Sequence, residues 1–241
     1  MVQDLRNTFS RRDDRKRSPV TIGKVMVSLG SIVGQAMALS LASRNAIREA
    51  NHGSRRQQRH EKHLEVGVDI PTKDELRAIL ASAKRRWRPL IVTAIYTGLR
   101  ATELRGLTWK DVDLCLALLT VQQRADGWNT LGAPKSAAGA RDVPLVKEVV
   151  STLREWKLAS PKGPLGGVFP ADDGNVVSLM VLRRSALGGA LVDAGISTSA
   201  RQPKYSMHNL RHAAASLLIE AGTFSPKEIQ TILGHSSIQF R

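Results

Sequence analysis

The chain has 241 residues, of which 42% are hydrophobic, so it can bury a core and is not a wholly disordered protein. With 36 Lys and Arg against 21 Asp and Glu, its formal net charge is +15, and a positive field of this size attracts polyanions such as DNA or RNA. Its single cysteine, Cys115, excludes an intrachain disulfide and a cysteine-based zinc site, and it fits a reducing cytoplasm. Charge alone leaves open a ribosome-adjacent or membrane-surface protein.

The N-terminal quarter is the most basic part of the chain, with 13 Lys and Arg against 5 Asp and Glu in residues 1–62. We expect residues 1–17 to be a basic, disordered start. Ser18 and Pro19 then predict the entry of a long helix that reaches about residue 42, because serine caps helices and proline suits their first turn.

The middle of that helix could be mistaken for a membrane segment. Residues 25–43 carry no charge and are about as long as a membrane span. Two glycines, a glutamine and four serines dilute the stretch, so we expect a buried amphipathic helix instead. A short helical continuation is predicted over 45–50, and the polar, basic residues 51–63 predict a linker.

A second unit is expected from residue 64 to residue 241. Thr72 and Glu75 form a capping-box pattern, which predicts a helix to about residue 85. Pro89 predicts the start of another, apolar helix that ends at Gly98.

Beyond this helix the hydrophobic period changes. Short strands joined by glycine-containing turns are predicted at 116–123, near 130 and at 141–145. Helices are predicted over 102–106, 146–158, 178–194, 207–221 and 226–233, the last from a second capping box. The fold class is therefore mainly α with a small antiparallel β-sheet in the middle, an α+β arrangement.

An arginine stands in the tight turn that follows the glycine-terminated helix. Arg100 would be held there by the backbone, with Glu103 near enough to orient it. Taken alone, Arg100 is as well explained as a surface arginine in a helical corner.

A second cluster, His208, Arg211 and His212, lies at the start of a predicted helix. Residues three apart share a helix face, so His208 and Arg211 should point the same way. Such a pair suits a phosphodiester, because arginine grips two oxygens in a fork while histidine exchanges a proton. The rival interpretation takes His208 and His212 as half of a metal site, but the glutamate of the metalloprotease pattern is missing.

Two further residues carry weak signals of their own. His235 follows a glycine that ends a helix, and Lys135 lies between two predicted strands, where a lysine is usually only a solvated charge. Each of these two residues indicates a functional site only when it is considered together with the other clusters.

Taken together, the order Arg, Lys, His-x-x-Arg, His resembles that of the tyrosine recombinases, the family of phage integrases. The matching stretches are TGLRATELRGLTWKDVDL (97–114), PKSAAGARDVPL (134–145), MHNLRHAAASLLIEAG (207–222) and ILGHSS (232–237). The resemblance covers essentially all of residues 70–240 and implies a tyrosine-recombinase catalytic fold over 64–241. Residues 18–63 resemble the last part of a helical core-binding (SAM-like) domain with its linker, and the earlier helices of that domain are expected to be absent.

The resemblance also implies a reaction, site-specific DNA recombination and integration. Members of the family cut one DNA strand by attack of a tyrosine, which leaves a 3′-phosphotyrosine and a free 5′-hydroxyl. By position, Arg100 and Arg211 would clamp the non-bridging phosphate oxygens, and Glu103 would support the site. Lys135 would protonate the leaving oxygen and His208 would exchange the proton of the nucleophile.

His235 would donate a hydrogen bond to the phosphate in the same scheme. No metal ion or other cofactor is expected. The implied partners are double-stranded DNA and other recombinase protomers, as in the tetramers of the family, with no membrane. The implied location is the prokaryotic cytoplasm, on the nucleoid.

The nucleophile is where this sequence departs from the family. The tyrosine should lie on the helix after His235, whereas this sequence reaches only Arg241. Its two tyrosines fit poorly, since Tyr96 falls in an apolar helix and Tyr205 in an expected strand before His208. We therefore expect the chain to bind DNA but to be deficient in cleavage, so that its status as an enzyme stays open.

Two other functions compete with a recombinase. One is a non-catalytic DNA-binding remnant of a prophage integrase, which an in-frame tyrosine soon after Arg241 in the source genome would argue against. The other is a helical metal-binding or regulatory protein whose motifs match by chance, which a metal assay would reveal.

Overall fold

The structure, a computed structural model, describes residues 18–55, 64–84, 86–134 and 139–234. The chain divides into two compact units, Met1–His63 and Leu64–Arg241. Each unit is described by itself below.

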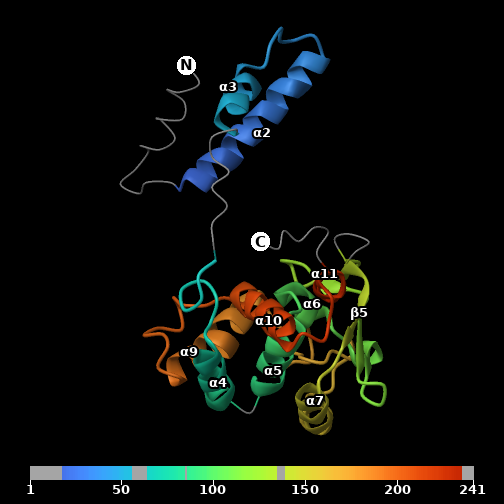
Figure 1. The fold of residues 1–241 in the computed structure, drawn as a ribbon. Helices are drawn as coiled ribbons and strands as arrows, with labels where there is room; N and C mark the ends of the chain where they lie inside the picture. Colours follow the sequence, from blue (N-terminus) through green and yellow to red (C-terminus); the bar gives the residue numbers. More distant parts are fainter. Residues whose placement is uncertain (1–17, 56–63, 85, 135–138, 235–241) are drawn as a thin grey trace. The chain divides into compact units, whose positions relative to one another are not determined.

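The first unit is a pair of packed helices, α2 (Pro19–Ala38) and α3 (Ala46–Arg55) (Figure 1). The predicted entry of α2 is confirmed, because Ser18 Oγ accepts the Thr21 amide at 3.2 Å. The helix ends a few residues before the predicted boundary.

The two helices are joined by one buried polar side chain. The Asn45 amide nitrogen donates to Gly30 O of α2 at 2.7 Å, and its carbonyl oxygen accepts the Arg48 amide at 3.0 Å. Asn45 therefore starts α3 as a new helix and ties it to α2. The predicted linker is wrong in its first residues, since α3 continues to Arg55.

Most of the surface of α2 is exposed, so the prediction of a buried helix is wrong. Only Met26 and Gly30 are buried in this helix, and Gly30 lies against Ile47 and Arg48 of α3. By length and composition alone α2 could cross a membrane, with a mean hydropathy of 1.4 and 11% of its apolar window buried. A core helix or a signal sequence passes the same test, so this is weak evidence.

The second unit is built mainly from helices that surround α5 (Figure 1). Its helical elements are α4 (Lys73–Ser82), α5 (Arg88–Thr97), α6 (Ala101–Gly106), η1 (Trp109–Asp111), α7 (Lys147–Ala159), α8 (Leu179–Val181), η3 (Leu182–Gly188), α9 (Gly189–Asp193), α10 (Met207–Ala221) and α11 (Pro226–Leu233).

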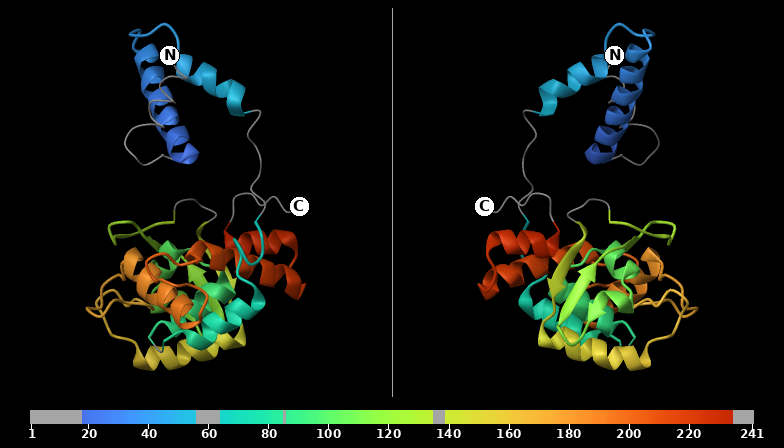
Figure 2. Two further views of the ribbon diagram at one scale, coloured as in Figure 1. Left: turned by 90° about the vertical axis from the view of Figure 1, so that its left-hand side faces the viewer. Right: turned by 90° about the vertical axis from the view of Figure 1, so that its right-hand side faces the viewer.

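The strands lie on one side of these helices (Figures 1 and 2). The larger sheet has the antiparallel order β1 (Val112–Asp113), β2 (Leu118–Val121), β5 (Arg141–Pro144). A separate hairpin pairs β3 (Arg124–Ala125) with β4 (Leu131–Gly132). The predicted fold class, mainly α with small antiparallel sheets, is confirmed.

Helix α5 is the centre of the core. It packs against α4, α7 and α10, and nearly all of its residues are buried. Pro89 lies at its start and Gly98 ends it in the left-handed conformation, as predicted, with φ of +62°. Because α5 is apolar on every face, its position is fixed by contacts all round.

Two predicted capping boxes are present, at the starts of α4 and α11. The predicted single helix over 178–194 is interrupted, since Leu182–Gly188 forms a π-helical turn between α8 and α9. A Cβ at Gly188 would lie 2.7 Å from Ala200 O, so the widened turn coincides with a close backbone approach.

Tyr205 lies outside any strand, contrary to expectation, and its side chain is fully buried. Its hydroxyl lies 2.8 Å from Glu75 Oε2 and 3.0 Å from Gly67 O, between which it shares its proton. Lys204 pairs with the other oxygen of the same carboxylate at 2.8 Å. Tyr205 therefore joins the segment before α10 to the start of α4.

We predict that Tyr205→Phe lowers the free energy of unfolding by about 1 kcal/mol, because the hydrogen bonds of the Tyr205 hydroxyl to the half-buried acceptors Glu75 Oε2 and Gly67 O are lost. Urea unfolding measures this loss. Tyr96→Phe is the matched control: no hydrogen bond of its hydroxyl occurs among the described residues, so a loss below about 0.5 kcal/mol is expected. Equal losses in the two variants would contradict the role of the Tyr205 hydroxyl.

Candidate active site

The turn between α5 and α6 places Arg100 and Glu103 together. Glu103 Oε2 accepts the Arg100 amide at 2.8 Å, and Glu103 Oε1 accepts Arg100 Nη1 at 2.7 Å. Glu103 is buried, while the Arg100 side chain keeps 40% of its surface exposed. The predicted orienting contact between these two residues is therefore present.

Helix α10 brings Arg211 to the same place from the far end of the sequence. Ser206 caps the helix, so Arg211 lies on its first turns and points into the core. Its guanidinium donates to Gly98 O at 2.7 Å and to Leu233 O, and its buried Nε has no partner in the described part of the chain. An unpartnered N–H in a buried cation is costly unless a further acceptor arrives.

A third arginine, which the sequence did not single out, completes the cluster. Arg141 of β5 donates through Nη2 to Glu103 Oε2 at 2.9 Å and through Nε to Ile232 O at 2.7 Å. The side chains of Arg141 and Val143 lie on the same, buried face of the strand. The alternation of the strand could have identified Arg141 from the sequence, because a cation at an inward strand position needs a buried partner.

We call Arg100, Arg141, Arg211 and Glu103 the arginine cluster. Its three guanidiniums donate to three successive carbonyls at the end of α11, those of Ile232, Leu233 and Gly234. In Figure 1, α6, β5 and α11 accordingly lie together. The helix terminus carries partial negative charge, so cations are favoured there.

The charge of the cluster is unbalanced. Three guanidiniums face one carboxylate, so a net positive charge remains in a largely buried place. Burial by itself would raise the pKa of Glu103, but hydrogen bonds and charge from Arg141, and then Arg100, lower it. Burial, with the charge of Arg100, lowers the pKa of Arg211 to about 9. An anion bound at this point would balance the excess positive charge and would favour the charged form of Arg211.

His208 and His212 stand beside the cluster, with ring centroids 4.5 Å apart in an edge-to-face arrangement. Burial, then the charges of Arg211 and Arg100, lower the pKa of His208. His208 is thus neutral at pH 7 and able to accept a proton. No set of three or more metal-binding side chains forms among the described residues.

Two of the predicted site residues, Lys135 and His235, lie outside the described residues. A described residue near each of them in sequence meets the cluster: Gly139 O, after Lys135, accepts Arg141 Nη1 at 2.9 Å, and Gly234 O, before His235, accepts Arg100 Nη2 at 2.8 Å. Neither tyrosine belongs to the cluster, since Tyr205 bonds near α4 and Tyr96 packs on the core.

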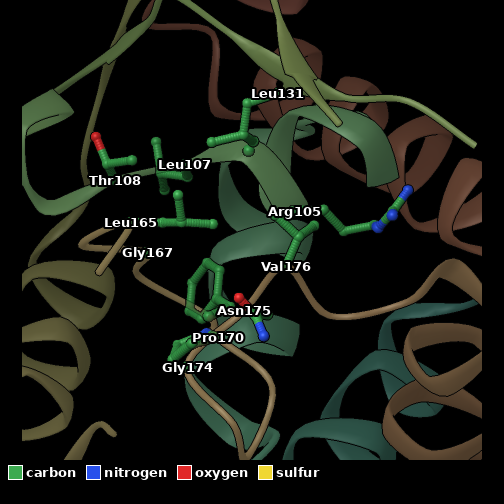
Figure 3. A pocket seen from close by; sticks show the side chains of 12 residues that line it. Arg105, Leu107, Thr108, Leu131, Leu165, Gly167, Pro170, Gly174, Asn175 and Val176 are labelled. Atoms are coloured by element: carbon green, nitrogen blue, oxygen red, sulfur yellow. The ribbon is translucent and has the colours of Figure 1, made fainter. Parts of the chain in front are cut away.

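Two cavities among the described residues could be considered as alternative sites, but neither is lined by a histidine or by a member of the arginine cluster. The one in Figure 3 holds about 10 Å³, room for a single water, and Arg105 at its edge directs its guanidinium away from the leucines. The other, about 530 Å³ between α5 and α7, is open and lined by Arg86, Arg88 and Trp156 among others. It contains none of the clustered arginines or histidines.

The sequence pattern of the phage integrase family matches residues 71–240, which include every member of the cluster. The chain belongs to the phage integrase family.

Individual members are similar at modest identity. The prophage integrase IntR of Escherichia coli (strain K12) is 29% identical over 192 residues, which cover 72% of this chain and 46% of that protein. The tyrosine recombinase XerC of Pelobacter propionicus is 27% identical over 222 residues, 90% of this chain and 65% of that protein. The chain thus spans about half to two thirds of the length of these relatives.

Solved structures share the fold of this phage integrase family member. The Tn1549 transposon integrase in complex with transposon right end DNA superimposes with a TM-score of 0.78, at 21% identity over 98% of this chain and 78% of that one. A lambda integrase tetramer bound to a Holliday junction gives 0.68, at 20% identity over 98% and 63%.

We predict that Glu103→Gln lowers the free energy of unfolding by about 3–5 kcal/mol, because it leaves buried guanidiniums without their carboxylate. The pKa of Glu103 is lowered, so its contribution is present above about pH 4.5, the unfolded value, and is lost as pH falls through the folded value. Urea unfolding between pH 3 and 7 should show this acid loss in the wild type and its absence in the variant.

The matched control is Glu220→Gln, which breaks an exposed ion pair with Lys73. It should cost at most about 1 kcal/mol. Loss of equal size in the two variants would show that the buried carboxylate does not hold the cluster together.

Proposed function

We propose that this chain acts in site-specific DNA recombination, as the part of a phage-type integrase that grips the DNA phosphate. The observation that carries the proposal is the arginine cluster, with three guanidiniums, one carboxylate and a buried N–H, Arg211 Nε, that has no partner among the described residues. A phosphodiester supplies the missing negative charge and the missing acceptor. The reaction is strand cleavage and rejoining through a 3′-phosphotyrosine.

Each residue of the site takes a role in this scheme. Arg100, the most exposed guanidinium of the cluster, meets one non-bridging oxygen, and Arg211 reaches the phosphate through its free Nε. Neutral His208 would take the proton of the attacking tyrosine and return it; neither Tyr96 nor Tyr205 lies in the cluster to act as that tyrosine. Lys135 protonates the leaving 5′-oxygen and His235 donates to the phosphate.

Glu103 supports this arrangement without touching the substrate, because both of its oxygens are occupied by Arg100 and Arg141. Its buried charge keeps two guanidiniums fixed before DNA arrives. Such preorganisation is what stabilises a pentavalent phosphate, since no donor has to move during the reaction.

The proposed partners are double-stranded DNA and further protomers of a tetrameric assembly. The Tn1549 integrase in its DNA complex and the lambda integrase tetramer on a Holliday junction support this by their shared fold. We place the protein in the prokaryotic cytoplasm, on the nucleoid, where chromosomal and prophage DNA meet. The net charge of +15 fits such a partner.

DNA binding should weaken steeply with salt, because each phosphate contact made by Lys or Arg releases counterions. We further predict that Arg100→Ala weakens duplex binding roughly ten-fold, as expected for loss of a charge-assisted contact. Fluorescence anisotropy over a salt series measures both effects. Arg77→Ala is the control, since Arg77 is exposed and paired only with Asp74, and it should change affinity less than about two-fold.

A DNA affinity that does not change with salt concentration would contradict the proposal that the basic surface binds DNA. An Arg100→Ala variant that binds DNA as tightly as the Arg77→Ala control would contradict the proposal that the arginine cluster binds the phosphate.

A chain of residues 1–241 should form no covalent adduct with a suicide DNA substrate, because neither Tyr96 nor Tyr205 lies in the cluster. Denaturing gel electrophoresis detects such an adduct. An adduct that disappears in Tyr96→Phe or Tyr205→Phe would identify a nucleophile that the geometry does not support. The sequence that follows Arg241 in the source genome separates a recombinase from a DNA-binding remnant.

A further inference from the structure

Arg141 makes more contacts than any role in phosphate binding requires. Its side chain is 2% exposed. It donates to both oxygens of Glu103, to Ile232 O and to Gly139 O, at 2.7–3.2 Å. All of these acceptors belong to the protein, and they come from three separate parts of the chain.

The acceptors lie at the roots of the segments that carry the remaining site residues. Gly139 closes the stretch that contains Lys135, and Ile232 precedes His235 by three residues. The third acceptor, Glu103, orients Arg100. One guanidinium therefore links Glu103 to described residues that lie near Lys135 and His235 in sequence.

Arg141 is packed against the backbone of α11 as well as bonded to it. A Cβ at Gly234 would lie 2.8 Å from Arg141 Nη1 and 2.9 Å from its Cζ. Gly234 has φ of +62°, so glycine is favoured there by conformation and also by this contact.

We propose that Arg141 is a positioning residue for the cleavage and rejoining of DNA strands. Its guanidinium sets the positions of the end of α11 and of the Glu103 carboxylate relative to Arg100. The inference rests on the proposed function for its consequence in DNA binding. Its structural half, that Arg141 holds the end of α11, stands without DNA.

The first test compares Arg141→Gln with Arg105→Gln. Arg105 is a matched control, since it is 4% exposed and donates hydrogen bonds to Val177 O, Asp126 O and Asn129, and in the described part of the chain it has no hydrogen bond to Glu103 or α11. Amide hydrogen exchange at the end of α11 should be about ten-fold faster in Arg141→Gln, relative to the amides of α7. Arg105→Gln should leave that ratio unchanged. Arg141→Lys serves in the same way should the glutamine variant fail to fold.

The second test uses two glycines with the same backbone conformation. Gly222, which ends α10, has φ of +65° and nothing within 4 Å of a Cβ, whereas a Cβ at Gly234 meets Arg141. Gly234→Ala should therefore lower the urea midpoint more than Gly222→Ala. In an Arg141→Gln background the difference between the two alanine variants should shrink, because the contact with the Arg141 guanidinium is gone.

The third test asks whether the position matters for DNA. Arg100→Ala should cost about ten-fold in affinity in the wild type and in Arg105→Gln, but under about three-fold in Arg141→Gln, because Arg100 is no longer held. A general loss of stability would not produce this difference.

Exchange at the end of α11 that rises no more than in α7, or an equal cost of Arg100→Ala in all backgrounds, would overturn the positioning role. A wild type in which Arg100→Ala has no effect on DNA affinity would overturn the proposed function instead. The exchange and glycine measurements contain no DNA, so they would still decide whether Arg141 holds α11.

Discussion

The arrangement of the second unit depends on one buried carboxylate among three guanidiniums. Glu103 accepts from Arg100 and Arg141, and the same arginines, with Arg211, hold the last carbonyls of α11. α6, β5, α10 and α11 are thereby joined through charged groups in a largely buried cluster. Buried charges need partners at hydrogen-bonding distance, so these bonds constrain where the elements meet.

Such a cluster contributes little net stability for its size. Removing three guanidiniums and a carboxylate from water costs several kcal/mol for each ion, and their attraction offsets this only where the geometry is good. What the cluster supplies is preorganisation, because the excess positive charge and the unpartnered Arg211 Nε are held before any ligand arrives. The core around α5 provides the stability on which that arrangement rests.

The sequence predicted most of the helical framework because the signals were local. Proline at the start and glycine at the end of α5, and the capping boxes of α4 and α11, each depend on a few neighbouring residues. The exposure of α2 within the described residues and the burial of Tyr205 were missed, since each depends on contacts with residues distant in sequence. Hydrophobicity predicts that a helix can be buried, but it does not supply the surface that buries it.

In the candidate site, too, local contacts could be predicted from the sequence and contacts between distant residues could not. Arg100 and Glu103 form a local pair three residues apart, and their contact could be predicted from that spacing. Arg141 has one local acceptor, Gly139 O, but its other acceptors, Glu103 and Ile232 O, lie 38 and 91 residues away in sequence, and only the folded unit brings them together. The inward phase of β5 marked it as unusual, because alternation placed a cation among the buried residues Val143 and Leu145. An arginine at an inward strand position indicates a buried acceptor elsewhere in the chain, and here that acceptor is the carboxylate on which the site depends.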